Sequence, residues 1–199
     1  MIERVDKSLP LNVGQMFRVV EPDRSNGAWI TTFSGRRFYV LDPRPQDVCI
    51  EDIAHALALQ CRFTGHIRKF YSVAQHCVLV SRFCPQEFAL WGLLHDASEA
   101  YIGDMSAPLK HTPEMSRFRT TEQHIMLAIA EHFGLGLVEP PAVKQVDRRL
   151  CLTEARDLLG STKDWQDASE PYAEAIVPWT PEFAERAFLC RFQELTSGR

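Results

Sequence analysis

Residues 93–105, LLHDASEAYIGDM, combine an apolar helical pattern with four ionisable side chains: His95, Asp96, Glu99 and Asp104. Polar groups of this kind are costly to bury unless they have partners, so the segment needs either hydrogen bonds or a bound ion. Imidazole nitrogens and carboxylate oxygens form the mixed ligand set expected of Zn, Mn, Fe or Co. The segment is therefore a candidate metal site.

The two adjacent residues His95 and Asp96 constrain where such an ion can lie. Neighbouring residues of a helix point about 100° apart, so they can share one ion only at the flank of the helix. A neighbouring helix must then supply the remaining ligands. His76 lies in a second apolar helical pattern, SVAQHCVLV. Taken singly, a histidine on an apolar face is more often a hydrogen-bonded core residue than a ligand.

The elements that position these residues are predicted to be mainly helical from residue 50 onward. The expected N-caps are Ser72 and Thr112, and Gly134 is the expected C-terminal glycine of its helix. The polar segment 161–179 predicts a long surface loop. About six helices are expected, over residues 50–61, 72–83, 85–103, 112–134 and 140–160, with the last after Thr180.

The first 48 residues differ in composition from the rest of the chain, because they are rich in aromatic and β-branched residues. Segments 29–33 and 37–41 predict a β-hairpin around the Ser34-Gly35 turn, and residues 16–22, MFRVVEP, suggest a third short strand. We divide the chain into a hairpin extension, residues 1–48, and a helical domain, residues 49–199, within one structural domain.

The composition excludes several classes of protein. A net charge of −4 gives no global basic field, which argues against a nucleic acid polymer as partner. The chain has no run of about 18 apolar residues and no signal-peptide pattern, so we expect no membrane span and a cytoplasmic location. The six cysteines include no C-x-x-C pair and are expected to be free, small apolar core residues.

Three blocks of the sequence resemble, in order, the HD-domain phosphohydrolase superfamily. They are RFTGHIRKFYSVAQHC, LLHDASEAYIGDMSAPLK and VKQVDRRLCLTEARDLL. His76, the pair His95-Asp96, and Asp147 match its H…HD…D pattern. The blocks are most similar to the bacterial and phage branch that contains 5′-deoxynucleotidases and phage dATP triphosphohydrolases. The resemblance covers roughly residues 29–160 and implies an HD-domain helical bundle.

The resemblance implies that these four residues hold one divalent transition metal: Co, Mn, Zn, Fe or Ni. Glu99, one turn after His95, would face the metal, and Asp104 would reach it from the following loop. Either carboxylate can orient the attacking water or take its proton. Simpler alternatives are a solvated Glu99, a turn residue at Asp104, and a surface ion pair for Asp147.

The resemblance also implies a substrate-binding set. Arg62 matches the arginine that binds phosphate in this branch, and Lys110 is a second candidate phosphate contact, with an exposed lysine as the alternative. Phe63 corresponds to a residue near the nucleoside and is a candidate for base stacking, with core packing as the alternative. Gly65 would let the backbone approach the ligand closely.

The predicted function is a metal-dependent phosphohydrolase of deoxynucleotides, with dATP the first substrate to test. Attack on the α-phosphorus would release deoxynucleoside and triphosphate, and additional Mg²⁺ could accompany the triphosphate. One alternative is a 5′-deoxynucleotidase that acts on monophosphates. Others are a phosphodiesterase or alarmone hydrolase, and a non-catalytic nucleotide-binding module. From the resemblance we also expect a homo-oligomer, either a dimer or a hexamer.

Overall fold

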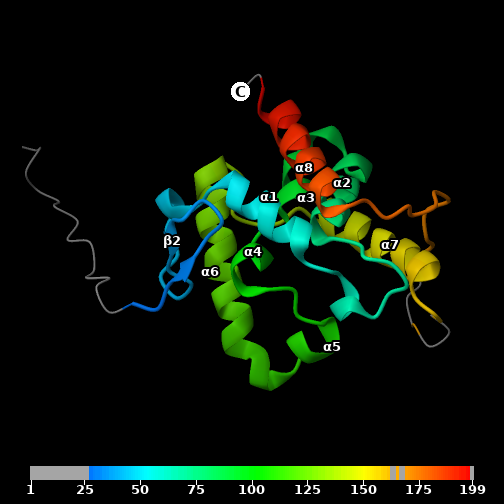
Figure 1. Ribbon diagram of the computed structural model, residues 1–199, viewed down its shortest axis with the longest axis horizontal. Coiled ribbons are helices and arrows are strands. Elements are labelled where there is room, and N and C mark those ends of the chain that lie inside the picture. The colour runs from blue at the N-terminus through cyan, green and yellow to red at the C-terminus, as the bar shows by residue number, and fades with distance from the viewer. Residues whose placement is uncertain (1–26, 162–164, 166–168, 198–199) are drawn as a thin grey trace, which may run out of the picture.

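The computed structural model describes residues 27–161, 165 and 169–197. The fold is mainly α-helical, as predicted. Four helices form the centre of one apolar core: α1 (Ile50–Leu59), α2 (Val73–Phe83), α3 (Ala89–Leu94) and α8 (Pro181–Thr196). Tyr101, Ile125 and Ile129, from two further helices, pack into the same core. In Figure 1, α6 (Ser116–Phe133) lies on one side of this centre, beside the hairpin, and α7 (Pro141–Leu158) lies on the other. None of the helices within the described ranges is long and apolar enough to span a membrane.

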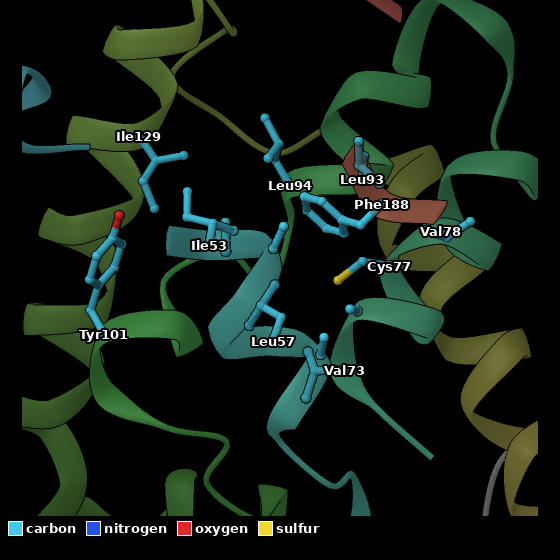
Figure 2. Close-up of a cluster of buried hydrophobic side chains, with 14 of the residues drawn as sticks. Ile53, Leu57, Val73, Cys77, Val78, Leu93, Leu94, Tyr101, Ile129 and Phe188 are labelled. Atoms are coloured by element: carbon cyan, nitrogen blue, oxygen red, sulfur yellow. The ribbon is translucent and has the colours of Figure 1, made fainter. Parts of the chain in front are cut away.

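The core forms because each central helix turns an apolar stripe inward. Ile53 and Leu57 of α1 belong to the same cluster as Val78 of α2 and Phe188 of α8 (Figure 2). All four side chains are fully buried, and burying a side chain of this kind contributes roughly 1.5–3 kcal/mol. This packing fixes the relative positions of α2 and α3, which position the two candidate histidines.

The helices α2 and α3 lie close together at Gly92. A Cβ atom at this position would lie 3.1 Å from the Cα atom of Ser81 and 3.0 Å from the Sγ atom of Cys84. The Ser81 hydroxyl also donates to the carbonyl of Ala89 at 2.8 Å. The first turn of α3 is therefore fixed against α2, and a larger residue at position 92 would force the helices apart.

The predicted capping residues are mostly confirmed. The Ser72 hydroxyl accepts a hydrogen bond from the amide three residues later at 3.1 Å. Gly134 ends α6 with a φ of +65°, a conformation that favours glycine. The prediction for Thr112 is wrong, because its side chain makes no capping bond and a 3₁₀ turn, Pro113–Met115, follows it. As a result α6 begins one turn later than predicted.

The prediction of one continuous helix over residues 85–103 is wrong. The structure has a 3₁₀ turn at Gln86–Phe88, then α3, a turn over residues 95–98, and α4 (Glu99–Ile102). A further single-turn helix, α5 (Ala107–Lys110), follows in a segment for which no helix was expected.

The interruption between α3 and α4 has a local cause. The amides of Ala97 and Glu99 each bond to the carbonyl three residues back at 3.0 Å, which is the tighter spacing of a 3₁₀ turn. The carbonyl of Gly92, which residue 96 would use in a continuous α-helix, accepts a hydrogen bond from Nδ1 of His95 at 2.9 Å. A side chain thus competes with the backbone for this acceptor at the candidate ligand pair.

The N-terminal hairpin is shorter than predicted but forms around the predicted turn. Strand β1 (Ile30–Thr31) pairs antiparallel with β2 (Arg37–Phe38). Phe38 is fully buried, and its ring stacks on Tyr101 of α4 with the ring centroids 3.6 Å apart. The hairpin therefore belongs to the same core as the helices.

Asp52 of α1 holds the hairpin turn. Its carboxylate accepts hydrogen bonds from the backbone amide and the hydroxyl of Ser34, at 2.6 and 2.9 Å. The predicted third strand, residues 16–22, lies outside the described residues.

The six cysteines are all free, as predicted. Cys49, Cys77 and Cys84 are buried like small apolar residues. Cys190 is exposed, so the prediction of a buried position is wrong there.

We expect Gly92→Ala to lower the free energy of unfolding by about 1–3 kcal/mol, because the added methyl group must push α3 away from α2. Urea unfolding measures the change. The control is Gly136→Ala, since a Cβ atom there has Trp91 Nε1 as its nearest neighbour, at 4.0 Å. Equal urea midpoints for the two variants would contradict the close approach of α2 and α3.

Candidate metal centre

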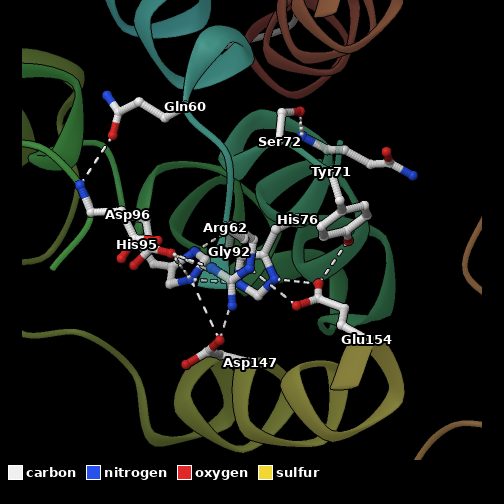
Figure 3. A network of polar contacts seen from close by, with 12 residues as sticks. Gln60, Arg62, Tyr71, Ser72, His76, Gly92, His95, Asp96, Asp147 and Glu154 are labelled. Atoms are coloured by element: carbon white, nitrogen blue, oxygen red, sulfur yellow. Dashed lines mark hydrogen bonds and ion pairs between the residues drawn. The ribbon is translucent and has the colours of Figure 1, made fainter. Parts of the chain in front are cut away.

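Four side chains from three parts of the chain converge between α2 and α7 (Figure 3). His76 comes from the first turn of α2, His95 and Asp96 come from the turn after α3, and Asp147 comes from α7. His76 is fully buried, whereas the Asp147 side chain is 39% exposed. The group is therefore reached from solvent at its Asp147 edge.

The spacing of these side chains suits a single bound cation. The Nε2 atoms of His76 and His95 are 3.3 Å apart. Oδ2 of Asp96 lies 3.2 Å from Nε2 of His95 and 3.7 Å from that of His76. Ligand atoms that share one transition metal lie about 3.0–3.6 Å from one another. His76, His95 and Asp96 thus form a group that could hold a metal ion, with their ligand atoms all within 4.8 Å of one another.

Asp147 flanks the same pair of nitrogens. Its Oδ1 atom is 3.1 Å from Nε2 of His76 and 3.9 Å from Nε2 of His95. The Asp147 side chain therefore points at the other predicted ligands. The alternative, a surface ion pair with the arginines that follow it in sequence, does not describe this position.

Both imidazole rings are fixed through their other nitrogen. Nδ1 of His76 lies 2.6 Å from Oε1 of Glu154, and Nδ1 of His95 lies 2.9 Å from the carbonyl oxygen of Gly92. A carboxylate and a carbonyl only accept hydrogen bonds, so each Nδ1 carries a proton and donates it. In the neutral ring Nε2 then presents a lone pair, and the two lone pairs face each other. Metal-ligating histidines are typically held in this way.

The surroundings of the two histidines favour positive charge. Burial lowers the pKa of His95, but Asp96 raises it well above the ordinary value. Burial and Arg62 lower the pKa of His76, but Glu154 and Asp147 act in the opposite direction, and the pKa is raised overall. Burial alone would raise the pKa of Asp96, whereas His95 holds it far below the ordinary value. A pocket that favours protons here also favours a metal cation, and the two compete.

The two carboxyl groups predicted to be catalytic lie beside this group. Glu99 is buried, and its Oε2 atom has no hydrogen-bond partner within the described ranges. Burial raises the pKa of Glu99 well above the ordinary value, and Asp96 and Asp104 raise it further. Burial also raises the pKa of Asp104. Glu99 is therefore not a solvated helix residue.

Gln60 fixes the backbone that carries these two carboxyl groups. Its Nε2 atom donates to the carbonyl of Glu99 at 2.9 Å, and its Oε1 atom accepts from the amide of Asp104 at 3.1 Å. One side chain at the end of α1 thus bridges both ends of α4. The sequence carries no motif that would identify Gln60.

Glu154, a fully buried residue on α7, was not predicted from the sequence. Its carboxylate accepts hydrogen bonds from three side chains: Tyr71 Oη at 2.7 Å, His76 Nδ1 at 2.6 Å and Arg62 Nε at 3.1 Å. Burial would raise the pKa of Glu154, but Arg62 holds it below the ordinary value. Glu154 lies two helical turns after Asp147, on the same face of α7. This seven-residue spacing is the signal that could have found it.

Arg62, the predicted phosphate ligand, lies at the edge of the ligand group. Its Nη1 atom is 3.5 Å from Oδ2 of Asp96, and its Nε atom bonds to Glu154. Burial lowers the pKa of Arg62, yet Glu154 and Asp96 raise it well above the ordinary value, so the guanidinium stays charged.

Lys110, the second predicted phosphate contact, is already paired. Its Nζ atom lies 2.5 Å from Oε1 of Glu122 on α6, and only 24% of its side chain is exposed. Burial lowers the pKa of Lys110, but Glu122 raises it, with smaller contributions from Glu99 and Asp96. Lys110 is therefore near the acidic cluster, but a neighbour neutralises its charge.

The backbone after Arg62 is strained. The 3₁₀ turn η3 (Phe63–Gly65) has positive φ at all three residues: +54°, +53° and +78°. For Phe63 and Thr64 such angles cost of order 1–3 kcal/mol each, and they tend to cluster at ligand-binding sites. Gly65 adopts this conformation freely. A Cβ atom on Gly65 would meet nothing within 4 Å, so the glycine is needed for its backbone angle.

Phe63 does not pack in the core. It is half-buried, and its ring centroid lies 6.3 Å from that of Trp165, with the planes tilted by 45°. The guanidinium of Arg62 is 5.5 Å from the Phe63 ring. The aromatic ring thus stands beside the predicted phosphate-binding arginine.

The residues present fit a divalent transition metal. Two oriented imidazoles and two carboxylates are a suitable donor set. The buried, unpartnered oxygen of Glu99 lies in the same acidic cluster. Around the two histidines, carboxyl groups outnumber the cationic side chains Arg62 and Lys110: they are Asp96, Glu99, Asp104, Glu139, Asp147 and Glu154. A bound cation would offset this excess of negative charge.

Comparison with known proteins gives two relatives that cover much of the chain. The chain is 40% identical to the protein YfdR of Escherichia coli (strain K12) over 178 residues, which are 86% of this chain and 98% of YfdR. It is 37% identical to a protein of Rhodobacter capsulatus over 138 residues, which are 65% of this chain and 70% of that protein. Both relatives are described as uncharacterized proteins. No protein-family model matches the chain.

We expect the chelator-treated protein to gain stability when Co²⁺ or Mn²⁺ is added, by about 2.7 kcal/mol at a hundred times the Kd. Asp96→Ala should lose most of this gain, because it removes a ligand and a negative charge next to both imidazoles. Thermal unfolding with and without metal measures the difference. Glu87→Ala, which removes an exposed carboxylate before α3, is the control and should keep the gain. A full gain in Asp96→Ala would rule out Asp96 as a ligand.

Proposed function

We propose that this chain, which belongs to the family of the Escherichia coli protein YfdR, is a metal-dependent phosphohydrolase of deoxynucleotides. The observation that carries the proposal is the pair of opposed Nε2 atoms of His76 and His95, 3.3 Å apart and flanked by Asp96. A charged arginine and two further buried carboxyl groups lie beside this pair. The resemblance of the three sequence blocks to HD-domain phosphohydrolases supports the same reading.

In this proposal His76, His95, Asp96 and Asp147 hold one divalent ion: Co, Mn, Zn, Fe or Ni. When bound, such an ion acts as a Lewis acid toward a phosphoryl oxygen and makes hydroxide available near neutral pH. The protein's own contribution is to keep both imidazoles in one tautomer, through Glu154 and the carbonyl of Gly92.

Arg62 binds the phosphate of the substrate in the proposed site. A guanidinium has five N–H donors, and Glu154 and Asp96 engage only Nε and Nη1. The donors that remain can form charge-assisted hydrogen bonds to phosphate oxygens. Because Glu154 fixes the guanidinium, little side-chain entropy is lost when phosphate binds.

Glu99 and Asp104 handle the proton of the attacking water. Burial and mutual repulsion raise the pKa of Glu99 well above the ordinary value, and a raised pKa suits a group that must take and return a proton near neutrality. The Oε2 atom of Glu99 has no hydrogen-bond partner among the residues that the structure describes, so it can accept the hydrogen bond of a water molecule.

Phe63 stacks on the base of the nucleotide. Its half-buried ring adjoins Arg62, so a ligand whose phosphate meets the guanidinium can place its base on this ring. An aromatic face accepts any base, so Phe63 contributes binding energy to every nucleotide alike.

The leaving group distinguishes two versions of the proposal. A dATP-like triphosphate would release triphosphate, and its tail would need cations beyond Arg62. Arg68 and Lys69 are exposed and could serve. The pairing of Lys110 with Glu122 favours the second candidate, a 5′-deoxynucleotidase that acts on monophosphates.

The direct test is a panel of deoxynucleoside mono- and triphosphates, incubated with chelator-treated protein and with protein loaded with each of the five metals. We expect metal-dependent product release. Triphosphate as product would select the first version and inorganic phosphate from monophosphates the second. Tight nucleotide binding by the metal-loaded protein with no turnover would instead indicate a non-catalytic binding module.

We expect Glu99→Gln to keep metal affinity and to lose roughly 10²–10⁴-fold in kcat, because the amide cannot take the proton of the attacking water. Steady-state kinetics and metal titration give the two readouts. Glu131→Gln, at an exposed position of α6, is the matched control and should behave as wild type. An unchanged kcat in Glu99→Gln would remove Glu99 from the mechanism.

We expect Phe63→Ala to weaken the binding of deoxynucleotides by roughly tenfold, since a base stacked on an aromatic side chain contributes about 1–3 kcal/mol. KM for the best nucleotide of the panel measures this change. Deoxyribose 5-phosphate, which has no base, serves as the control ligand, and its binding should not change. Equal losses for both ligands would mean that Phe63 supports the fold or Arg62 and does not contact the base.

A further inference from the structure

Glu154 connects the two halves of the candidate site. On one side its Oε1 atom accepts from Nδ1 of His76 at 2.6 Å, and on the other its Oε2 atom accepts from Nε of Arg62 at 3.1 Å. The first hydrogen bond joins Glu154 to a predicted metal ligand, and the second joins it to the proposed phosphate-binding residue. Tyr71 also donates to Oε1, at 2.7 Å.

These contacts leave Glu154 little freedom. Glu154 and Tyr71 are fully buried, and so is His76. The carboxylate is held by three donors from two other segments of the chain, so its position is overdetermined. A buried carboxylate without such donors would be strongly destabilising. Glu154 therefore does more than fill space in the core.

We propose that Glu154 is a positioning residue that selects the tautomer of His76 with Nε2 unprotonated and, with the same carboxylate, fixes the guanidinium of Arg62. This inference rests on the proposed function, since it assigns Glu154 to the metal centre and the phosphate site described above. Glu154 itself touches neither the metal nor the substrate.

The isosteric variant Glu154→Gln tests the assignment, because a neutral amide cannot satisfy all three donors. A hydrogen bond to the charged Arg62 is stronger than one to a neutral group, so the amide oxygen should turn toward the guanidinium. The NH₂ group then faces Nδ1 of His76 and the hydroxyl of Tyr71, and both can accept from it. His76 must now carry its proton on Nε2, where it points at the metal position.

The first readout is the tautomer of His76 in metal-free protein, measured by ¹⁵N NMR at alkaline pH where the ring is neutral. Wild type should show the Nδ1–H tautomer and Glu154→Gln the Nε2–H tautomer. A wild-type protein with the Nε2–H tautomer would overturn the proposal without any variant, so the test does not depend on whether Glu154→Gln folds.

The second readout is Co²⁺ affinity by titration of the metal-free proteins. Partners that orient metal ligands typically contribute 10–100-fold to affinity, and Glu154→Gln should lose about that much. Tyr71→Phe is the matched control, because it removes one donor and leaves the contacts of Glu154 to His76 and Arg62. Its tautomer and Co²⁺ affinity should stay close to wild type.

The outcomes separate this proposal from the proposed function. A folded Glu154→Gln protein with the wild-type tautomer and wild-type Co²⁺ affinity would overturn the role of Glu154 and leave the phosphohydrolase proposal intact. Wild-type protein that binds Co²⁺ but hydrolyses no nucleotide would overturn the proposed function, while a reversed tautomer in Glu154→Gln would still support the role of Glu154.

Discussion

The candidate site depends on two imidazole rings whose Nε2 atoms face each other at 3.3 Å. Each ring is fixed from behind, one by a carboxylate and the other by a backbone carbonyl. Two opposed lone pairs repel unless a proton or a metal ion lies between them. The helices that carry these rings must therefore be rigid enough to maintain an arrangement that is unfavourable without a cation.

The packing of α2 against α3 supplies that rigidity. Gly92 allows the close approach of the two helices, and its carbonyl also fixes His95. The same residue thus sets the distance between the helices and the orientation of one ring. The helix is interrupted just beyond this point, and the tight turn brings His95 and Asp96 to one side before α4 begins. The interruption costs regular backbone hydrogen bonds and brings Glu99 into the acidic cluster.

Much of the fold could be predicted because its signals are local. Ser72 and Gly134 mark helix ends through backbone chemistry that depends on a few neighbouring residues. The candidate ligands were found for a related reason, since an ionisable residue within an apolar stripe is conspicuous in the sequence. The break after α3 could not be predicted, because it depends on a side chain of the helix competing for a backbone carbonyl. Glu154 has a local signal in its seven-residue spacing from Asp147, but its role depends on partners that lie 78 to 92 residues away.

The charges of the site bear on how an anionic substrate can enter it. With both imidazoles neutral, the carboxylates around them outnumber the cationic side chains Arg62 and Lys110, so the pocket is negatively charged. A phosphate group would be repelled from such a pocket, and Glu122 further reduces the attraction of Lys110. A bound divalent ion would offset part of this negative charge, and Glu99 would stay available to take a proton. Arg62 can then attract phosphate, because the carboxylates around it no longer dominate the local field. Under the proposed function, residues that hold a cation would thus aid the binding of an anionic substrate as well as the chemistry.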